Sequence, residues 1–169
     1  MTRNFLFMLE KFFHPNSIAI IGASANKKKL GFKLLENLIK CGYKGRIYPV
    51  NLQEKKILAL PVFANITEIK NKIDLAIIAI PAPLVLSVLR DCGRKKIKNV
   101  IIISAGFKEI GSVGAKLEEE ISKICQKYKI NLLGPNCLGI LSSHHNLNAS
   151  FAKGMIKRGS VAFISQSGA

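Results

Sequence analysis

Short runs of apolar residues recur along the chain at intervals of roughly thirty residues, and most of them are rich in isoleucine and valine. Several runs are nearly continuous, which is typical of strands that a parallel sheet buries on both faces. We therefore expect strands at residues 17–22, 46–50, 74–80, 99–104, 130–134 and 160–165.

Helical patterns lie between several of these runs. In three segments, apolar residues recur at spacings of three and four, which places them on one face of a helix. The three sets are Leu30, Leu34, Leu35, Leu38 and Ile39; Leu84, Val85, Val88, Leu89 and Cys92; and Val113, Leu117, Ile121, Ile124 and Tyr128. The segment 51–73 is less regular, and we expect a short helix near Thr67. Alternating strands and helices predict an α/β fold with a Rossmann-like, doubly wound, mostly parallel sheet.

The composition narrows the class of protein. A chain of 169 residues with 49% hydrophobic residues suits one ordinary domain with a well-filled core, and argues against disorder. The longest apolar region, residues 75–89, is interrupted by Pro81 and Pro83 and is too short to cross a bilayer. The apolar run near the N-terminus is brief and does not fit a signal peptide. We therefore expect a cytoplasmic location.

The net charge of +16 favours an anionic partner, such as a nucleic acid, an anionic membrane surface or a phosphorylated small molecule. The lysines are spread along the chain, and the chain has no tryptophan. Because basic and aromatic residues do not alternate, a nucleic-acid partner is disfavoured. The four cysteines and three histidines have no recognisable metal-ligand spacing, so we expect reduced cysteines and no metal site.

The loop after the first apolar run has the features of an anion site. Its backbone N–H groups would lie at the start of a helix, where a phosphate is favourable. Glycines would permit a tight turn and a close approach of the helix, while small polar and lysine side chains would add donors and charge. These residues are Gly22, Gly31, Ser24, Asn26, Lys27, Lys28 and Lys29. The glycine spacing matches neither the dinucleotide-binding motif nor the P-loop, so the loop alone does not identify the ligand.

The end of the second predicted strand is more informative. Asn51 stands where NAD-binding folds place an acidic residue for the ribose hydroxyls, and the next carboxylate is Glu54. This disfavours NAD and suits a nucleotide with an extra phosphate, such as NADP or coenzyme A. The third strand ends at Pro81 and Pro83, which would make a rigid apolar lip for an adenine ring.

Three further loops follow predicted strands and are rich in glycine and small polar residues. They span residues 104–111, 134–139 and 165–168. Because the carboxyl ends of parallel strands meet at one edge of a sheet, we expect all of these loops to face the same ligand as the first loop.

Seven stretches together resemble one known family. They are FFHPNSIAIIGAS, YPVN, DLAIIAIPA, IIISAGFKEIG, LLGPNCLGI, LNASFA and FISQSGA, which span almost the whole chain in the family's order. On these motifs the chain resembles the coenzyme A-binding domain of the nucleoside-diphosphate-forming acyl-CoA synthetases. That superfamily includes ADP-forming acetyl-CoA synthetase, which fits best, and the alpha subunit of succinyl-CoA synthetase. Bacterial protein lysine acetyltransferases that carry this module are also similar.

The resemblance implies a role for each matched position in holding coenzyme A. The phosphates would lie against the first loop, the adenine at the end of the third strand, the pantetheine arm along the fourth, and the thiol near Asn136. The implied residues are Gly22, Ser24, Ala25, Asn26, Lys27 and Gly31; Ile80, Pro81 and Ala82; Ile103, Ser104 and Ala105; and Asn136. Ser167 and Gly168 would open a helix of the next domain, whose N-terminus receives the phosphate of a phosphohistidine.

The chain also departs from the family pattern. Leu52 and Gln53 stand where the family usually has Pro-Lys, so the 3′-phosphate of coenzyme A would need Lys55 or Lys56 instead. The family's catalytic histidine would lie beyond Ala169, and the ATP-grasp module has no counterpart. We expect a coenzyme A-binding domain at 1–155 and the truncated start of a succinyl-CoA-synthetase-like, flavodoxin-type domain at 156–169.

The implied reaction converts an acid, coenzyme A and ATP into acyl-CoA, ADP and phosphate through an acyl phosphate and a phosphohistidine. We expect this chain to bind coenzyme A and not to turn over without the phosphohistidine and ATP-grasp parts. Three alternatives stay open: a standalone coenzyme A or nucleotide sensor, the N-terminal module of a protein lysine acetyltransferase, and an NADP-linked oxidoreductase.

Overall fold

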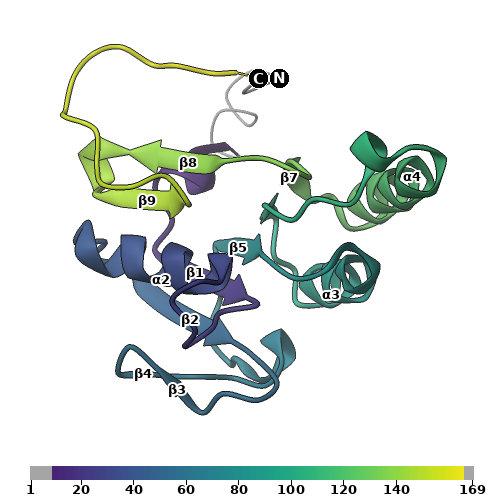
Figure 1. Cartoon of the computed structure of the whole chain (residues 1–169), viewed down its shortest axis with the longest axis horizontal. Coiled ribbons are helices and arrows are strands. Elements are labelled where there is room, and N and C mark those ends of the chain that lie inside the picture. Colours follow the sequence, from purple (N-terminus) through teal and green to yellow (C-terminus); the bar gives the residue numbers. More distant parts are fainter. Residues whose placement is uncertain (1–8, 166–169) are drawn as a thin grey trace.

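The computed structural model describes residues 9–165, which form an α/β domain built on one parallel sheet (Figure 1). The sheet has five strands in the order β2-β1-β5-β6-β7. Their bounds are β1 Ser17–Ile21, β2 Arg46–Val50, β5 Leu75–Ile78, β6 Asn99–Ile102 and β7 Asn131–Leu133. The first five predicted strands and the Rossmann-like parallel sheet are therefore confirmed.

Three helices connect the strands of the sheet, and short elements fill the remaining segments. The helices are α2 Leu30–Lys40, α3 Ala82–Arg94 and α4 Ser112–Tyr128, and residues 9–13 are also helical. The short strands are β3 Lys56–Ile57, β4 Leu60–Pro61, β8 Gly139–Ser142 and β9 Leu147–Ser150. The 3-10 helices are η1 Ile66–Glu68, η2 Lys108–Ile110 and η3 Ser143–His145. The expected short helix near Thr67 is η1.

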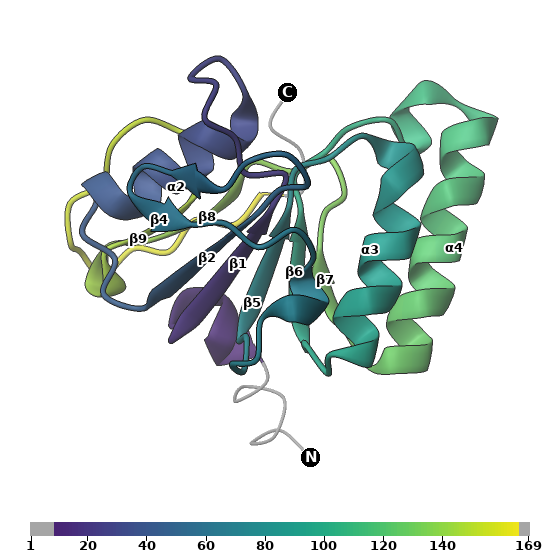
Figure 2. The same ribbon diagram turned by 90° about the horizontal axis from the view of Figure 1, so that it is seen from below.

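The two faces of the sheet are covered by different elements, as Figure 2 shows. Alternate residues of each strand point to opposite faces, so Ile21 and Ile78 pack with α3 and α4, whereas Ile20 and Ile77 pack with α2. The β8–β9 hairpin and the helical residues 9–13 complete the α2 face. Both faces are buried, which explains the nearly continuous apolar runs. None of the helices in the described part of the chain is long and apolar enough to span a membrane.

The predicted apolar faces of the helices are buried at their centres, but some residues near the helix ends are exposed. Leu34, Leu38 and Ile121 are buried as expected. The outlying members Leu30, Ile39, Leu84 and Val113 are exposed. Buried residues flank them in the same helical turns, so these side chains lie at the margin of the buried face and not within it.

The sixth predicted strand is wrong. Residues 160–165 have no regular secondary structure, and Val161, Phe163 and Ile164 are each about nine-tenths exposed, at 92%, 88% and 90%. A strand requires a neighbour whose backbone groups it can pair with, and none of the sheets in the described residues includes this segment. Ser167 and Gly168 lie outside the described residues.

Candidate functional site

The strand order has a switch point between β1 and β5. β1 is followed by a crossover to β2 on one side, while β5 continues the sheet on the other side. The loops that leave two neighbouring strands in opposite directions open a gap between them, and this is where α/β sheets bind ligands. The loops after β1 and β5 therefore mark the candidate site.

Two glycines allow the β1–α2 loop to lie close to its neighbours. Gly22 adopts a φ of +89°, and its N–H donates to the carbonyl of Val50 at 3.0 Å. A Cβ atom on Gly22 would lie 2.3 Å from the carbonyl oxygen of Ala79 in the β5 loop. A Cβ atom on Gly31 would lie 1.9 Å from the carbonyl oxygen of Gly22. These contacts give the physical reason for both glycines, because any larger side chain would push the helix away from the turn.

The polar side chains of this loop first stabilise the loop itself. The Ser24 hydroxyl is buried and accepts a hydrogen bond from the Asn26 N–H at 3.1 Å. The Asn26 side chain accepts from the Lys28 N–H at 2.9 Å. Ala25, Asn26 and Lys27 are exposed, and the helix N-cap at Lys29 makes no side-chain cap. The amide groups at the start of α2 are thus a suitable place for an anion, with positive charge beside them.

Asn51 has a role that the sequence did not predict. Its Nδ2 donates to the carbonyl of Ala23 at 2.7 Å, and its Oδ1 accepts from the N–H groups of Gln53 and Glu54 at 2.7 and 3.1 Å. The side chain therefore joins the end of β2 to the first loop. An acidic residue could accept these two N–H bonds but could not donate to Ala23, so the asparagine suits this geometry.

Glu54 is a functional candidate that sequence reasoning missed. Its Oε1 accepts a hydrogen bond from the Ala25 N–H at 3.3 Å, so a carboxylate sits on one of the loop amides that would face a phosphate. The signal in the sequence was the Asn51 turn, which directs the chain after β2 back toward the first loop.

The loops after β5, β6 and β7 are joined by a chain of hydrogen bonds. The Ser104 hydroxyl donates to the carbonyl of Ile80 at 2.5 Å, and the Asn136 N–H donates to the carbonyl of Ser104 at 3.0 Å. Asn136 has a φ of 53° and follows the cis peptide bond between Gly134 and Pro135. These bonds hold three loops, far apart in the sequence, at one edge of the sheet.

The structure thus brings together most of the predicted coenzyme A positions. The residues at this edge are Gly22, Ser24, Ala25, Asn26, Lys27 and Gly31; Ile80, Pro81 and Ala82; Ile103, Ser104 and Ala105; and Asn136. The side chains of Ala82, Ile103 and Ser104 are buried, so these three positions would offer a ligand mainly their backbone. Whether these residues bind coenzyme A stays a prediction.

The cysteine nearest this edge is not suited to act as a nucleophile. The Cys137 thiol donates to the carbonyl of Ile102 at 3.4 Å, and burial is the largest cause that raises its pKa. Burial likewise raises the pKa of Cys92 to about 12 and that of Cys125 to about 11. All three thiols are therefore protonated near neutral pH. Within residues 9–165 no group of three histidine, cysteine or acidic side chains could hold a metal ion.

Comparison with known proteins agrees with this geometry. The family model of the CoA binding domain matches residues 16–143. The chain is 46% identical over 162 residues to the alpha subunit of acetate–CoA ligase [ADP-forming] II of Pyrococcus furiosus. This match covers 96% of this chain and 35% of that protein. It is 42% identical over 157 residues to 4-hydroxybutyrate–CoA ligase [ADP-forming] of Nitrosopumilus maritimus, covering 92% of this chain and 22% of that protein.

A solved structure has the same fold. The dinucleotide-forming acetyl-coenzyme A synthetase 1 of Ca. Korarchaeum cryptofilum, in complex with phosphate and ADP, superposes with a TM-score of 0.91 at 39% identity. The match covers 95% of this chain and 34% of that one, so the chain spans about a third or less of these relatives. From the family match, the strand order and the loops at the carboxyl edge, we conclude that the chain belongs to the CoA binding domain family.

Proposed function

We propose that this chain binds coenzyme A at the carboxyl edge of its sheet, as the coenzyme-binding part of an ADP-forming acyl-CoA synthetase. The observation that carries the proposal is that the loops after β1, β5, β6 and β7 meet at the carboxyl edge of the sheet, where the N-terminus of α2 has no side-chain cap. The diphosphate would accept hydrogen bonds from the loop amides, and Lys27 to Lys29 would add positive charge.

The direction of the remaining groups follows from this placement. The adenine would rest against Ile80 and Pro81, which border the first loop, and the pantetheine arm would run past Ala105 toward Asn136. Leu52 is largely exposed and offers no charge to a 3′-phosphate, whereas Lys55 and Lys56 are exposed on the same segment. We propose that one of these two lysines contacts the 3′-phosphate.

The proposed reaction is that of a larger enzyme: an acid, coenzyme A and ATP give acyl-CoA, ADP and phosphate through an acyl phosphate and a phosphohistidine. This chain would position the thiol, while the phosphohistidine and ATP-grasp parts would come from the regions of the relatives that it does not span. The relatives are named for acetate and for 4-hydroxybutyrate, which leaves the acid of this system open. A cytoplasmic location is part of the same proposal.

We further propose that residues 156–169 begin a second domain. In the described part of this segment, Ile156, Val161, Phe163 and Ile164 are exposed although the run has the composition of a buried strand. Apolar side chains that are exposed in succession indicate a surface that another part of the protein covers. Ser167 and Gly168 would then open the phosphate-binding helix of that domain.

Calorimetric titration of the purified chain with coenzyme A tests this function, with dephospho-coenzyme A and NADP as parallel ligands. Saturable binding of coenzyme A, weakened by loss of the 3′-phosphate and absent for NADP, is the expected result. Lys27→Gln should weaken binding, whereas Lys127→Gln, which removes a lysine at the far end of α4, should not. A folded chain that binds none of the ligands would refute the proposal.

A further inference from the structure

A cavity lies at the opposite edge of the sheet from the proposed coenzyme site. It has a volume of about 480 Å³, within the range of sites for small ligands. Its walls come from the residues before β1, the turn before β2 and the segment around η3. They are His14, Pro15, Asn16, Tyr43, Lys44, Gly45, Arg46, His144, His145 and Asn146. The proposed function uses none of these residues.

The lining of this amino-edge cavity is basic. Lys44 and Arg46 are exposed cations just before and at the start of β2, and three histidines belong to the same lining. The rings of His14 and His145 stack with centroids 3.8 Å apart and planes 15° apart. His144 Nε2 lies 3.2 Å from the carbonyl oxygen of Gly159. All five side chains can donate hydrogen bonds, and all can carry positive charge.

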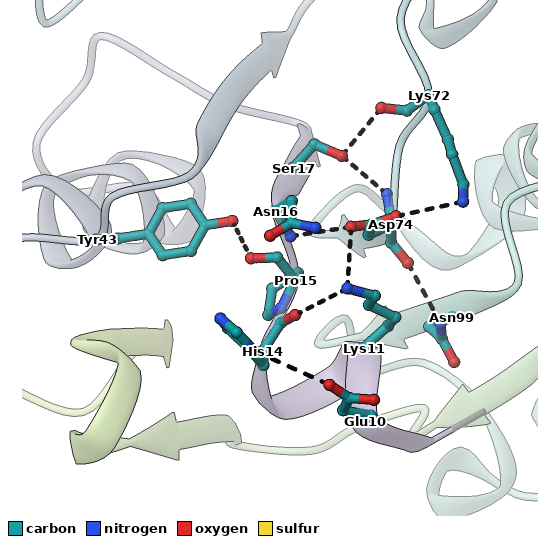
Figure 3. Close-up of polar contacts among 10 residues, drawn as sticks. All are labelled: Glu10, Lys11, His14, Pro15, Asn16, Ser17, Tyr43, Lys72, Asp74 and Asn99. Atoms are coloured by element: carbon teal, nitrogen blue, oxygen red, sulfur yellow. Dashed lines mark hydrogen bonds and ion pairs between the residues drawn. The ribbon is translucent and has the colours of Figure 1, made fainter. Parts of the chain in front are cut away.

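The nearby carboxylates offset only part of the charge of this lining. Asp74 accepts a hydrogen bond at 2.9 Å from the N–H of Asn16, a lining residue, and lies 3.8 Å from Lys11 Nζ and 4.0 Å from Lys72 Nζ (Figure 3). Glu10 lies 4.0 Å from His14 Nδ1. Neither carboxylate lines the cavity, whose lining residues include no acidic side chain.

The stacked imidazoles define the kind of ligand. Two imidazolium rings 3.8 Å apart repel each other, so an anion bound beside the pair would offset that repulsion. A metal ion does not fit, because the described residues contain no set of three suitable ligands. An apolar ligand would gain nothing from the cations and imidazoles that dominate this lining, whereas an anion would accept their hydrogen bonds.

We propose that the amino-edge cavity binds a diphosphate-bearing anion through Lys44, Arg46 and the protonated rings of His14 and His145. The diphosphate could be inorganic or carried by a nucleotide. The site is separate from the coenzyme A site, because the two lie at opposite ends of the parallel strands.

Binding depends on pH because protonation of the rings supplies part of the charge. Burial first, and then the charges of His14, His144 and Arg158, lower the pKa of His145, while Glu10 opposes them. A bound anion adds an attractive charge and would favour the protonated form of the His145 ring. Affinity therefore increases as the pH falls from about 7.5 to about 6, the range in which histidine titrates.

NMR titration of the whole chain tests the proposal. The histidine ring signals are followed as pyrophosphate is added at about pH 6 and about pH 7.5, and the series is repeated with ADP and in the presence of saturating coenzyme A. Saturable shifts of His14 and His145, tighter at the lower pH and retained with coenzyme A, are expected. Shifts with pyrophosphate alone would identify an inorganic ligand, and tighter binding of ADP a nucleotide.

Two double variants that remove the same charge distinguish a specific site from nonspecific electrostatic attraction of the anion to a basic protein. Lys44→Gln with Arg46→Gln should weaken pyrophosphate binding by about tenfold, because both charge-assisted contacts are lost. Lys116→Gln with Arg90→Gln removes the same charge from exposed positions on α4 and α3 and should leave the affinity within about twofold. Equal losses in the two double variants, unshifted histidine signals, or displacement of pyrophosphate by coenzyme A would overturn the proposal.

Discussion

Both edges of the sheet would attract phosphate, but through different chemical groups. At the carboxyl edge the first loop offers backbone amides and glycines, and an acidic side chain, Glu54, occupies one amide. At the amino edge the cavity offers side-chain cations and imidazoles, and its lining residues include no acidic side chain. Backbone donors hold their direction at every pH, whereas imidazole charge varies with pH. Ligand affinity at the carboxyl edge should therefore change little with pH, whereas ligand affinity at the amino edge should depend on it.

The glycine contacts at the carboxyl edge allow the largest test of this comparison. Gly31→Ala places a Cβ atom 1.9 Å from the carbonyl oxygen of Gly22, so the helix and turn must separate. We expect a loss of about 3 kcal/mol in the free energy of unfolding, because overpacking against backbone cannot relax cheaply. Urea unfolding followed by circular dichroism measures it, and coenzyme A affinity should fall in parallel.

The matched control for this variant is Gly159→Ala. Gly159 has open space around its Cβ position and no positive φ, so the same substitution should change stability by less than about 0.5 kcal/mol. Similar losses in both variants would show that the close approach at the carboxyl edge is not what the glycine provides.

Asp74 gives the corresponding test at the amino edge. It is 8% exposed, and besides its side-chain contacts its N–H donates to Ser17 Oγ at 3.0 Å and its carbonyl accepts from Asn99 Nδ2 at 3.3 Å (Figure 3). Asp74→Ala should cost about 2 kcal/mol, because the Asn16 N–H and two lysines lose their anionic partner. Differential scanning calorimetry would detect it as a lowered melting temperature.

Asp91→Ala is the control for that variant, because it removes an ion pair with the exposed Arg94 at 2.8 Å on the surface of α3. Surface pairs of this kind contribute about 0 to 1 kcal/mol. If Asp91→Ala were as destabilising as Asp74→Ala, the amino-edge network would hold no special position in the fold.

The two edges also differ in how far the sequence predicted them. The carboxyl edge was predictable because buried parallel strands have nearly continuous apolar sequences, and each glycine-rich loop follows its strand directly in the chain. The amino-edge cavity was not, because His14, Lys44 and His145 come from three separate segments. No local sequence pattern shows that such segments lie close together in the fold. These histidines also belong to no recognised sequence motif, so the sequence did not single them out.

At the β8–β9 hairpin, polar residues are buried, so polarity alone does not predict exposure. Asn148 and Ser150 are polar and completely buried, because the Ser150 hydroxyl donates to Asn148 Oδ1 at 2.7 Å and Asn148 Nδ2 donates to the carbonyl of Gly154 at 2.6 Å. In contrast, the apolar residues 161–164 are exposed. Periodicity predicts that a residue can be buried, but hydrogen-bond partners and neighbouring elements decide whether it is.

Ser104→Ala is expected to have an intermediate effect, confined to the carboxyl edge. It removes the hydroxyl that joins the β6 loop to the carbonyl of Ile80, so we expect a loss of about 1 kcal/mol in stability and severalfold weaker coenzyme A binding. Ser87→Ala removes an exposed hydroxyl that donates to Leu84 on α3 and should change neither quantity. Unchanged coenzyme A affinity in Ser104→Ala would separate the loop bond from the coenzyme site.

Glu54→Gln should have a smaller effect and in the favourable direction. Glutamine can still accept from the Ala25 N–H, but the negative charge beside the phosphates is gone, so coenzyme A affinity should rise by about threefold at low salt. Glu68→Gln, which keeps a similar bond from the Ala64 N–H away from the loop, serves as control. Weaker binding in Glu54→Gln alone would show that the carboxylate contributes directly to the ligand site.

The smallest expected effect is the pH dependence of stability at the amino edge. The folded state lowers the pKa of His145, so the unfolded chain binds more protons as the pH falls through the ordinary histidine range. Stability contributed by the neutral ring is therefore present above about pH 6.5 and is lost below it. His145→Gln should flatten this dependence in melting curves, whereas His144→Gln, whose ring lies outside the stacked pair, should flatten it less.

Pyrophosphate should restore stability more at about pH 6 than at about pH 7.5, because binding to the charged rings offsets their repulsion. A pH dependence that His145→Gln leaves intact would show that the amino edge, like the carboxyl edge, does not change with pH, and the contrast between the two edges would fail.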